Sequence, residues 1–299
     1  MFDRNTCPIT ASTQLTEKAS APYGSGLLGE WAEQRKQGAR LAEQSYVILH
    51  NPAIDFYFQR SVFDQSEEVQ RRQAIAGRRV EVRLLGLSDL EHKAEDAMLV
   101  RLLHGDARPR VLDYGMGEGH WAEMARAYGS EVWGTDVDPR SERVAAESGV
   151  HFAADVAALE DASFDFINAD QVFEHLPDPL GVIRELAAKL RSGGHLKIST
   201  PADDGIEAKL ARLNSGGYAL DEFKREFHAL APLSHINLFT AASLRALAAA
   251  AGLESFRVPL RTCYAVMTGF QSARQLNRNL YNPFKRYRAR GTWQFFRKP

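Results

Sequence analysis

The sequence predicts an α/β fold in which a mostly parallel, doubly wound sheet of seven strands carries helices on both faces. From Arg110 onward, short apolar segments alternate with helices of about ten residues, which is the pattern of βαβ units. A glycine-rich loop, Gly115–Gly119, joins the first of these strands to its helix. The 299 residues, 44% of them hydrophobic, can bury a core of that size without a disulfide or a metal.

We expect residues 1–104 to form a mainly helical region that serves as a lid or as a dimerisation arm. Residues 1–20 lack a clear period and predict a loose lead-in. The elements that follow are a helix over Leu27–Gln44, a strand over Tyr46–Leu49, a strand or helix end over Arg79–Leu85 and a helix over Ser88–His104. The aromatic side chains between them are expected in the core: Phe56, Tyr57, Phe58 and Phe63.

We expect the central domain to span residues 105–270. Its strands are predicted at Arg110–Tyr114, Glu131–Thr135, His151–Ala153, Phe164–Asn168, His195–Ser199, Ser255–Leu260 and Cys263–Met267. Its helices are predicted at Trp121–Tyr128, Pro139–Ser148, Leu180–Leu190 and Ala241–Ala251. An insertion over 202–233, which contains a charged helix at Asp221–Ala229, is expected to cover the mouth of the ligand crevice as a substrate cap.

The charge of the chain is unevenly distributed. The net charge is −1, but residues 255–299 contain ten Lys or Arg and no Asp or Glu, which leaves 27 basic and 38 acidic residues in the first 254. We therefore expect residues 271–299 to form a basic, aromatic tail. Such a tail can fold back onto the acidic body, touch an anionic membrane surface or stack on bases.

Composition excludes several classes. The longest apolar runs are far shorter than the ~20 residues that cross a bilayer, and the N-terminus does not resemble a signal peptide. The two cysteines, Cys7 and Cys263, provide neither a disulfide framework nor a zinc site of the CxxC type. We expect a cytoplasmic protein without a metal.

The glycine loop has the form D-x-G-x-G-x-G, from Asp113 through Gly115 and Gly117 to Gly119. Glycines at a strand–helix junction let a ligand lie against bare backbone, and the next helix directs its positive end toward that ligand. The third glycine comes one residue earlier than in the dinucleotide motif, and the carboxylate of Asp113 suits a cationic ligand better than a pyrophosphate.

Two further carboxylates follow the next strands. Asp136 ends the second strand, where an acid can accept hydrogen bonds from ribose hydroxyls, although it could instead cap the helix at Pro139. Asp155 follows the third strand and can accept a hydrogen bond from an adenine amino group.

These segments follow one another in a recognisable order: VLDYGMGEGHWA, EVWGTDVDP, FAADV, FDFINADQVFEHLPDP and LRSGGHLKISTP. The chain resembles the class I S-adenosylmethionine-dependent methyltransferases, within them the small-molecule branch that includes the ubiquinone-biosynthesis O-methyltransferases. The resemblance covers about Arg110 to Leu260. It implies a Rossmann-like fold and S-adenosylmethionine as the cofactor.

The resemblance also implies a set of cofactor contacts. The glycines would hold the methionine moiety, with Asp113 near its amino end. Asp136 would bind the ribose and Asp155 the adenine. The remaining contacts that it implies are Val137, Val156, Ala169, Asp170 and Gln171, the last three close to the sulfonium.

The implied chemistry is in-line methyl transfer to a small-molecule acceptor, with oxygen as the expected acceptor atom. A neutral acceptor can need a general base, for which His175 and His235 are the candidates. The alternative for His175 is that the segment Glu174–Pro179 only caps and orients a helix.

Two other functions stay open: a nicotinamide-dependent oxidoreductase on a similar sheet, and a methyltransferase fold that binds cofactor or partner without turnover. We do not expect nucleic acid as the substrate. The segment Asp170–Phe173 differs from the tetrad of amino-methylating enzymes, and neither cysteine follows a proline as in cytosine C5 enzymes. A homodimer through the N-terminal region is compatible with the sequence.

Overall fold

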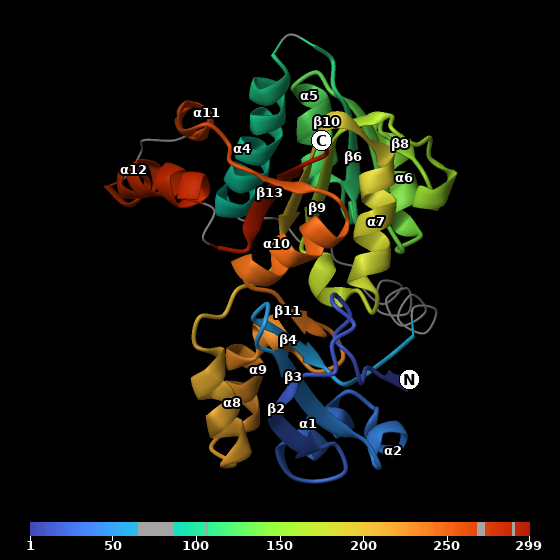
Figure 1. Cartoon of the computed structure of the whole chain (residues 1–299), viewed down its shortest axis with the longest axis vertical. Helices are drawn as coiled ribbons and strands as arrows, with labels where there is room; N and C mark the ends of the chain where they lie inside the picture. Colours follow the sequence, from blue (N-terminus) through green and yellow to red (C-terminus); the bar gives the residue numbers. More distant parts are fainter. Residues whose placement is uncertain (65–86, 106, 268–272, 289–290) are drawn as a thin grey trace.

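The computed structural model describes residues 1–64, 87–105, 107–267, 273–288 and 291–299 (Figure 1). Its central element is a seven-stranded sheet in the order β12-β13-β10-β9-β6-β7-β8. The strands are β6 (Arg110–Tyr114), β7 (Glu131–Thr135), β8 (His151–Phe152), β9 (Phe164–Asp170), β10 (Leu190–Ser199), β12 (Glu254–Phe256) and β13 (Trp293–Arg297). The neighbours from β10 to β8 pair in parallel and β13 pairs antiparallel, so the predicted mostly parallel sheet is confirmed.

Helices cover both faces of this sheet because neighbouring residues of its strands point to opposite sides. Val111 and Phe166 belong to the core shared with α4 (Leu87–His104), α5 (His120–Ala127) and α6 (Arg140–Ser148). Leu112 and Ile167 belong to the core shared with α7 (Pro179–Lys189) and α10 (Ala241–Ala250). The doubly wound arrangement is thus confirmed, with the helices close to their predicted ranges.

A smaller antiparallel sheet lies beyond the carboxyl ends of the parallel strands (Figure 1). Its order is β11 (Asn237–Leu238), β4 (Phe56–Gln59), β3 (Ser45–Asn51) and β2 (Thr16–Pro22). Around it lie α1 (Gly26–Gln34), α2 (Gly38–Leu41), α8 (Ile206–Asn214), α9 (Leu220–Glu226) and the pair β1 (Phe2–Asp3) with β5 (Ser61–Val62). Within the region 1–104 that was expected to be mainly helical, α4 is a long helix, whereas the described residues up to Phe63 hold more strand than helix.

The aromatic segment explains this difference. Phe56 and Phe58 belong to the core around the seven-stranded sheet, which we call the large domain. Tyr57 belongs to the buried cluster around the four-stranded sheet, the small domain, together with Trp31 and Phe223. This alternation of side chains between two cores is typical of a strand. The aromatic cluster is buried as expected, and the insertion 202–233 contributes α8 and α9 to the small core.

Two late segments differ from their predicted structure. Cys263–Met267 was expected as a strand, but helix α11 spans Leu260–Ala265. Cys263 on this helix and Val266 directly after it are buried, follow helical spacing and pack in the core next to α4. Residues 271–299, expected as a tail outside the central domain, supply α12 (Ala273–Arg288) and then β13 within the sheet.

Strand β13 is held from both faces. Phe295 is buried in the core between the sheet and helices α4 and α5. Phe296 is buried on the opposite face, in the core with α7 and α10. The predicted element at Arg79–Leu85 lies outside the described residues. Among the residues that the structure describes, no helix is long and apolar enough to span a membrane.

Candidate active site

A cavity of about 250 Å³ opens at the carboxyl ends of the parallel strands. Ligands of open α/β sheets bind at this edge. The predicted residues on its wall are Gly115, Asp136, Val137, Asp155, Val156, Gln171 and His175. The wall is completed by residues that the sequence analysis did not single out: Tyr114, Thr135, Ala154, Val172, Leu176, Pro177, Asp178, Val182 and Glu185. Tyr114, Thr135, Ala154 and Val172 lie at or just after a strand end, which was their available signal, whereas the other five lie in the turn before α7 or on α7 itself.

The other predicted site residues do not line the cavity. Gly117 and Gly119 lie further along the loop, Ala169 is fully buried, and Asp113, Asp170 and His235 lie outside the wall. Of these residues, Gly117 and His235 contact the wall residues Asp136 and His175.

The position of Gly115 accepts only a residue without a side chain. Its φ is +79°, in the left-handed region, and a Cβ atom there would lie 2.5 Å from Cγ2 of Val172 across the cavity wall. Its N–H donates to the carbonyl of Thr135 at 2.9 Å. The loop after β6 is therefore bound directly to the end of β7, and the bare backbone of Gly115 lets Val172 pack closely against it on the wall.

Asp136 links the loops after β6 and β7. Its Oδ2 accepts the N–H of Gly117 at 2.7 Å, and its Oδ1 accepts the N–H of Asp138 at 2.8 Å. It does not cap α6, whose N-cap is Pro139. Because each carboxylate oxygen can accept two hydrogen bonds, both keep capacity for a hydroxyl in the cavity.

Asp155 occupies a comparable position after β8. Its Oδ1 accepts the N–H of Ala157 at 2.9 Å and so caps the short 3₁₀ turn Val156–Ala158. The side chain is exposed and lines the cavity next to Val156. It can therefore cap this turn and still accept a hydrogen bond from a ligand.

Asp113 is buried under the site, with 3% of its surface exposed. Its Oδ1 accepts a 2.8 Å hydrogen bond from Nδ2 of Asn168 on the neighbouring strand β9. Burial raises the pKa of Asp113 to about 6, against the lowering effects of Asn168 and Lys93. Asp113 thus links the carboxyl-terminal ends of β6 and β9 beneath the cavity.

Asp170, at the end of β9, belongs to a buried ionic network. Nζ of Lys197 lies 3.3 Å from Oδ1 of Asp170 and 2.7 Å from Oδ2 of Asp96 on α4. Burial alone would raise the pKa of Asp170, but Lys197 and Lys93 hold it well below its usual range. The next residue, Gln171, has a φ of +58°, which is uncommon for a side chain of this size. Its N–H donates to the carbonyl of Ser199 at 2.9 Å, so a fixed bend leads the chain into the cavity.

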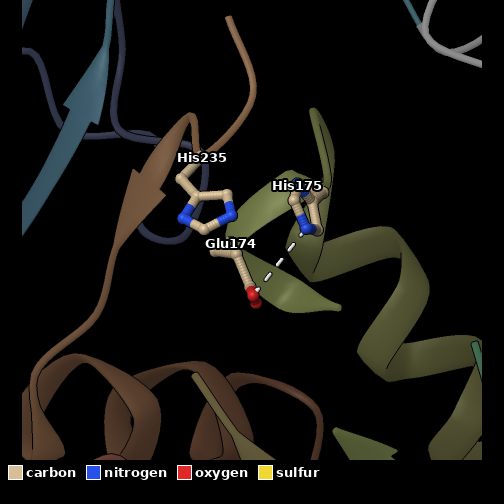
Figure 2. Close-up of side chains that lie close together, drawn as sticks. All are labelled: Glu174, His175 and His235. Atoms are coloured by element: carbon tan, nitrogen blue, oxygen red, sulfur yellow. Dashed lines mark ion pairs between the residues drawn. The ribbon is translucent and has the colours of Figure 1, made fainter. Parts of the chain in front are cut away.

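The two candidate histidines lie together, although 60 positions separate them in the chain. Figure 2 shows Glu174 and His175 on one segment and His235 on another, with the three side chains turned toward one another. The imidazole rings of His175 and His235 are 4.7 Å apart at 76°, and Nε2 of His175 lies 3.8 Å from Oε1 of Glu174. Glu174 is 1% exposed.

Hydrogen bonding fixes the orientation of His175. Its Nδ1 lies 2.7 Å from the carbonyl of Ser234, which can only accept, so Nδ1 carries the proton in the neutral ring. Nε2 therefore holds the lone pair. One potential ligand atom from each of Glu174, His175 and His235 lies within 4.8 Å of the other two, a donor set that also suits a divalent metal ion. The group can thus take up a proton or a cation.

The profile of a family described as a methyltransferase domain matches residues 87–257 of this chain. Two curated relatives are named ubiquinone biosynthesis O-methyltransferase. The one from Ralstonia nicotianae is 35% identical over 159 residues, 50% of this chain and 64% of its own length. The one from Cupriavidus pinatubonensis is 33% identical over 134 residues, 42% of this chain and 53% of its own length. The chain thus spans between about half and two thirds of these relatives.

Among solved structures, the chain is similar to the 1,6-didemethyltoxoflavin-N1-methyltransferase of Burkholderia thailandensis. That similarity has a TM-score of 0.47 at 21% identity and covers 85% of this chain and 95% of the other.

Proposed function

The chain belongs to the methyltransferase domain family, which its residues 87–257 match, and from this premise we propose that it transfers a methyl group from S-adenosylmethionine to an oxygen of a small-molecule acceptor. The observation that carries the proposal is the cavity at the carboxyl ends of β6, β7 and β8. Gly115, Asp136 and Asp155 line this cavity, and they are the residues that the resemblance implies for the methionine, ribose and adenine parts of the cofactor.

The residues present fit this cofactor. The side chain of Val172 packs where a Cβ atom of Gly115 would lie, so the bare loop backbone and Val172 together form a wall of the cavity against which a ligand can lie. Asp136 would hold the ribose hydroxyls and Asp155 the adenine amino group, since both carboxylates line the cavity and keep acceptor capacity. When bound, S-adenosylmethionine supplies a methyl group that is activated for displacement by the positive sulfonium.

We assign to His175 the role of general base. Its Nε2 holds the lone pair because Nδ1 donates to Ser234, and His175 is the histidine that lines the cavity. Nε2 would accept the proton of the acceptor hydroxyl as the new C–O bond forms. The buried carboxylate of Glu174, 3.8 Å away, would stabilise the resulting imidazolium, and His235 would support the ring through its edge-to-face contact.

We further propose that the small domain covers the part of the site where the methyl acceptor binds. The insertion 202–233 would then act as the expected cap, and residues 1–104 as the expected lid. Ser234, directly after this insertion, holds His175. The Nδ2 group of Asn237 donates to the carbonyls of Phe173 and Leu176 at 3.0 and 2.8 Å. Residues that follow the insertion are therefore joined to the turn that carries the proposed base.

Calorimetric titration of S-adenosylhomocysteine and, separately, of NAD into the purified chain tests the cofactor assignment. We expect micromolar binding of S-adenosylhomocysteine and much weaker binding of NAD. The opposite order would indicate a nicotinamide-dependent oxidoreductase. Binding of S-adenosylhomocysteine with an identified acceptor left unmethylated would indicate a binding protein without turnover.

A further inference from the structure

Helix α12 presents an apolar stripe to solvent. Leu276, Leu280, Phe284 and Tyr287 follow the 4-4-3 spacing that places side chains on one face of a helix. Their exposed fractions are 48%, 54%, 46% and 36%. Tyr281 of the same helix is 62% exposed. Large apolar side chains gathered in this way mark an interaction surface.

The helix is attached to the body through other residues. Arg278 lies 2.7 Å from a carboxylate oxygen of Glu91 and 3.1 Å from one of Glu95, both on α4. Asn279 is 4% exposed. Figure 1 shows α12 at the side of the large domain, near α4 and α11. The apolar stripe therefore faces solvent, while Arg278 and Asn279 attach the helix to the body.

Helix α11 extends the same surface. Tyr264 is 38% exposed, its ring lies 6.0 Å from that of Phe284, and its hydroxyl donates to the carbonyl of Leu280 at 3.2 Å. We call the combined surface the tail patch, and it consists of Tyr264, Leu276, Leu280, Tyr281, Phe284 and Tyr287. It accounts for six of the nine large hydrophobic side chains that are exposed in the described part of the chain.

The charge of the segment indicates the partner. Helix α12 carries five basic residues, namely Arg274, Arg278, Lys285, Arg286 and Arg288, and no acidic one. Within residues 255–299 there are ten basic residues and no acidic one, whereas the first 254 residues have a net charge of −11. A helix with an apolar and aromatic face and a Lys/Arg-rich remainder is the type that lies in the interface of an anionic bilayer.

We infer that the tail patch docks on an anionic lipid surface, with the apolar face of α12 among the headgroups and the positive charge of residues 255–299 attracting the segment to lipid phosphates. This inference stands independently of the proposed methyl transfer.

A second copy of the chain fits the patch less well. Two tail patches placed face to face would bring together two basic helices. The acidic body of another copy is complementary in charge, but its other exposed large hydrophobic residues in the described part are Phe2, Leu102 and Val137, which lie on separate elements. An apolar stripe therefore has no matching apolar surface there.

Co-sedimentation of the full chain with vesicles tests the inference. We expect binding to phosphatidylcholine vesicles that contain about 30% phosphatidylglycerol. Binding should weaken at least about tenfold on pure phosphatidylcholine or when NaCl is raised to about 0.5 M. The double variant Leu280→Asp/Phe284→Asp should lose binding, whereas Phe284→Leu should keep it. Leu102→Asp, an apolar-to-acid change at a site 43% exposed outside the patch, is the matched control and should bind like the wild type.

Three results would overturn the inference. The first is equal binding of the double variant and the Leu102→Asp control, because docking would then not involve the patch. The second is a wild-type mass in solution that is twice that of the double variant, which would assign the patch to a second copy. The third is tighter binding of a single-stranded oligothymidine than of anionic vesicles. Thermal unfolding of each variant confirms that the substituted chains are folded.

Discussion

The backbone N–H of Gly117 donates a 2.7 Å hydrogen bond to Oδ2 of Asp136, so the glycine loop after β6 and the acid after β7 form one unit. The second oxygen of Asp136 accepts the N–H of Asp138 at 2.8 Å. Both oxygens are thus oriented by backbone before any ligand arrives. Such preorganisation lowers the ordering cost of binding, which makes Asp136 the residue on which the cofactor assignment depends most directly.

Gly115→Ala should weaken binding of S-adenosylhomocysteine by about tenfold or more. The new Cβ atom would lie 2.5 Å from Cγ2 of Val172, and relief of that clash must change the cavity wall that both residues form. Calorimetric titration measures the effect. The matched control is Gly129→Ala, at a φ of +96°, where a new Cβ atom would meet no atom of the described residues within 4 Å. It should cost about 1–3 kcal/mol of stability and leave the affinity unchanged; equal affinities in the two variants would contradict the steric argument.

His175→Ala should lower the rate of methyl transfer by about 100-fold or more once an acceptor is in hand, with little change in affinity for S-adenosylhomocysteine. His235→Ala should lower it less, because His235 contacts His175 and does not line the cavity.

The control for a general effect of histidine removal is His92→Ala, with its side chain 48% exposed on α4, which should retain full activity. The geometry of Glu174, His175 and His235 also suits a metal ion, so a chelator separates the two roles. Activity that persists after treatment with EDTA supports a base, in keeping with the expectation that no metal is used. Activity lost with EDTA and restored by one divalent ion would instead assign these residues as ligands.

Asp113→Asn should make the fold less sensitive to pH. Burial raises the folded-state pKa of Asp113 from 3.8 to about 6, so the folded chain retains a proton that the unfolded chain has lost between these values. The wild-type free energy of unfolding therefore falls as pH rises from about 4 to 6, by at most about 3 kcal/mol from this group. Asparagine keeps the oxygen that accepts from Asn168 and carries no charge.

Urea unfolding of wild type and Asp113→Asn at pH 4 and pH 7.5 measures that difference. The variant should gain stability relative to the wild type between the lower and the higher pH. A constant difference between the two proteins at both pH values would contradict the assigned cause.

Lys197→Met should destabilise the fold by about 3–5 kcal/mol, because it leaves the carboxylates of Asp96 and Asp170 without the buried cation that lies between them. Lys189→Met is the matched control. The carboxylate that pairs with Lys189, Asp161, has its side chain 71% exposed, so that change should cost at most about 2 kcal/mol. Denaturant unfolding measures both, and equal losses would show that the Lys197 network contributes no more than the pair of Lys189 with the exposed Asp161.

The sequence predicted the central sheet well because its signal is local. Strands β6 to β9, and β10 from His195 onward, are short segments rich in apolar residues. Helix α10 has Thr240 as its N-cap, and the side chain of Thr240 forms a capping box with Ser243. Strand β13 was not predicted, since Trp293–Arg297 lies in a basic segment and becomes a strand only through pairing with the distant β10. Cys263–Met267 is too short an apolar run for periodicity to distinguish helix from strand.

The site was predictable where a residue type and a strand end coincide, as for Asp136 and Asp155 on the cavity wall. Asp113 is the last residue but one of β6, and its side chain turns inward to Asn168, a direction that the sequence does not show. The pairing of His175 with His235 depends on how the small domain folds against the large one. That arrangement is set by long-range packing between residues far apart in the chain.

Calorimetric titration of S-adenosylhomocysteine into wild type, Asp136→Ala and Asp138→Ala tests the central claim most directly. Asp138 is the control because it lies in the same turn, pairs with Arg140 and does not line the cavity. We expect micromolar affinity for the wild type and Asp138→Ala, and a loss of at least about tenfold, about 1.4 kcal/mol, in Asp136→Ala. Unchanged affinity in Asp136→Ala, or a wild type that binds NAD more tightly than S-adenosylhomocysteine, would contradict the assignment of this cavity to S-adenosylmethionine.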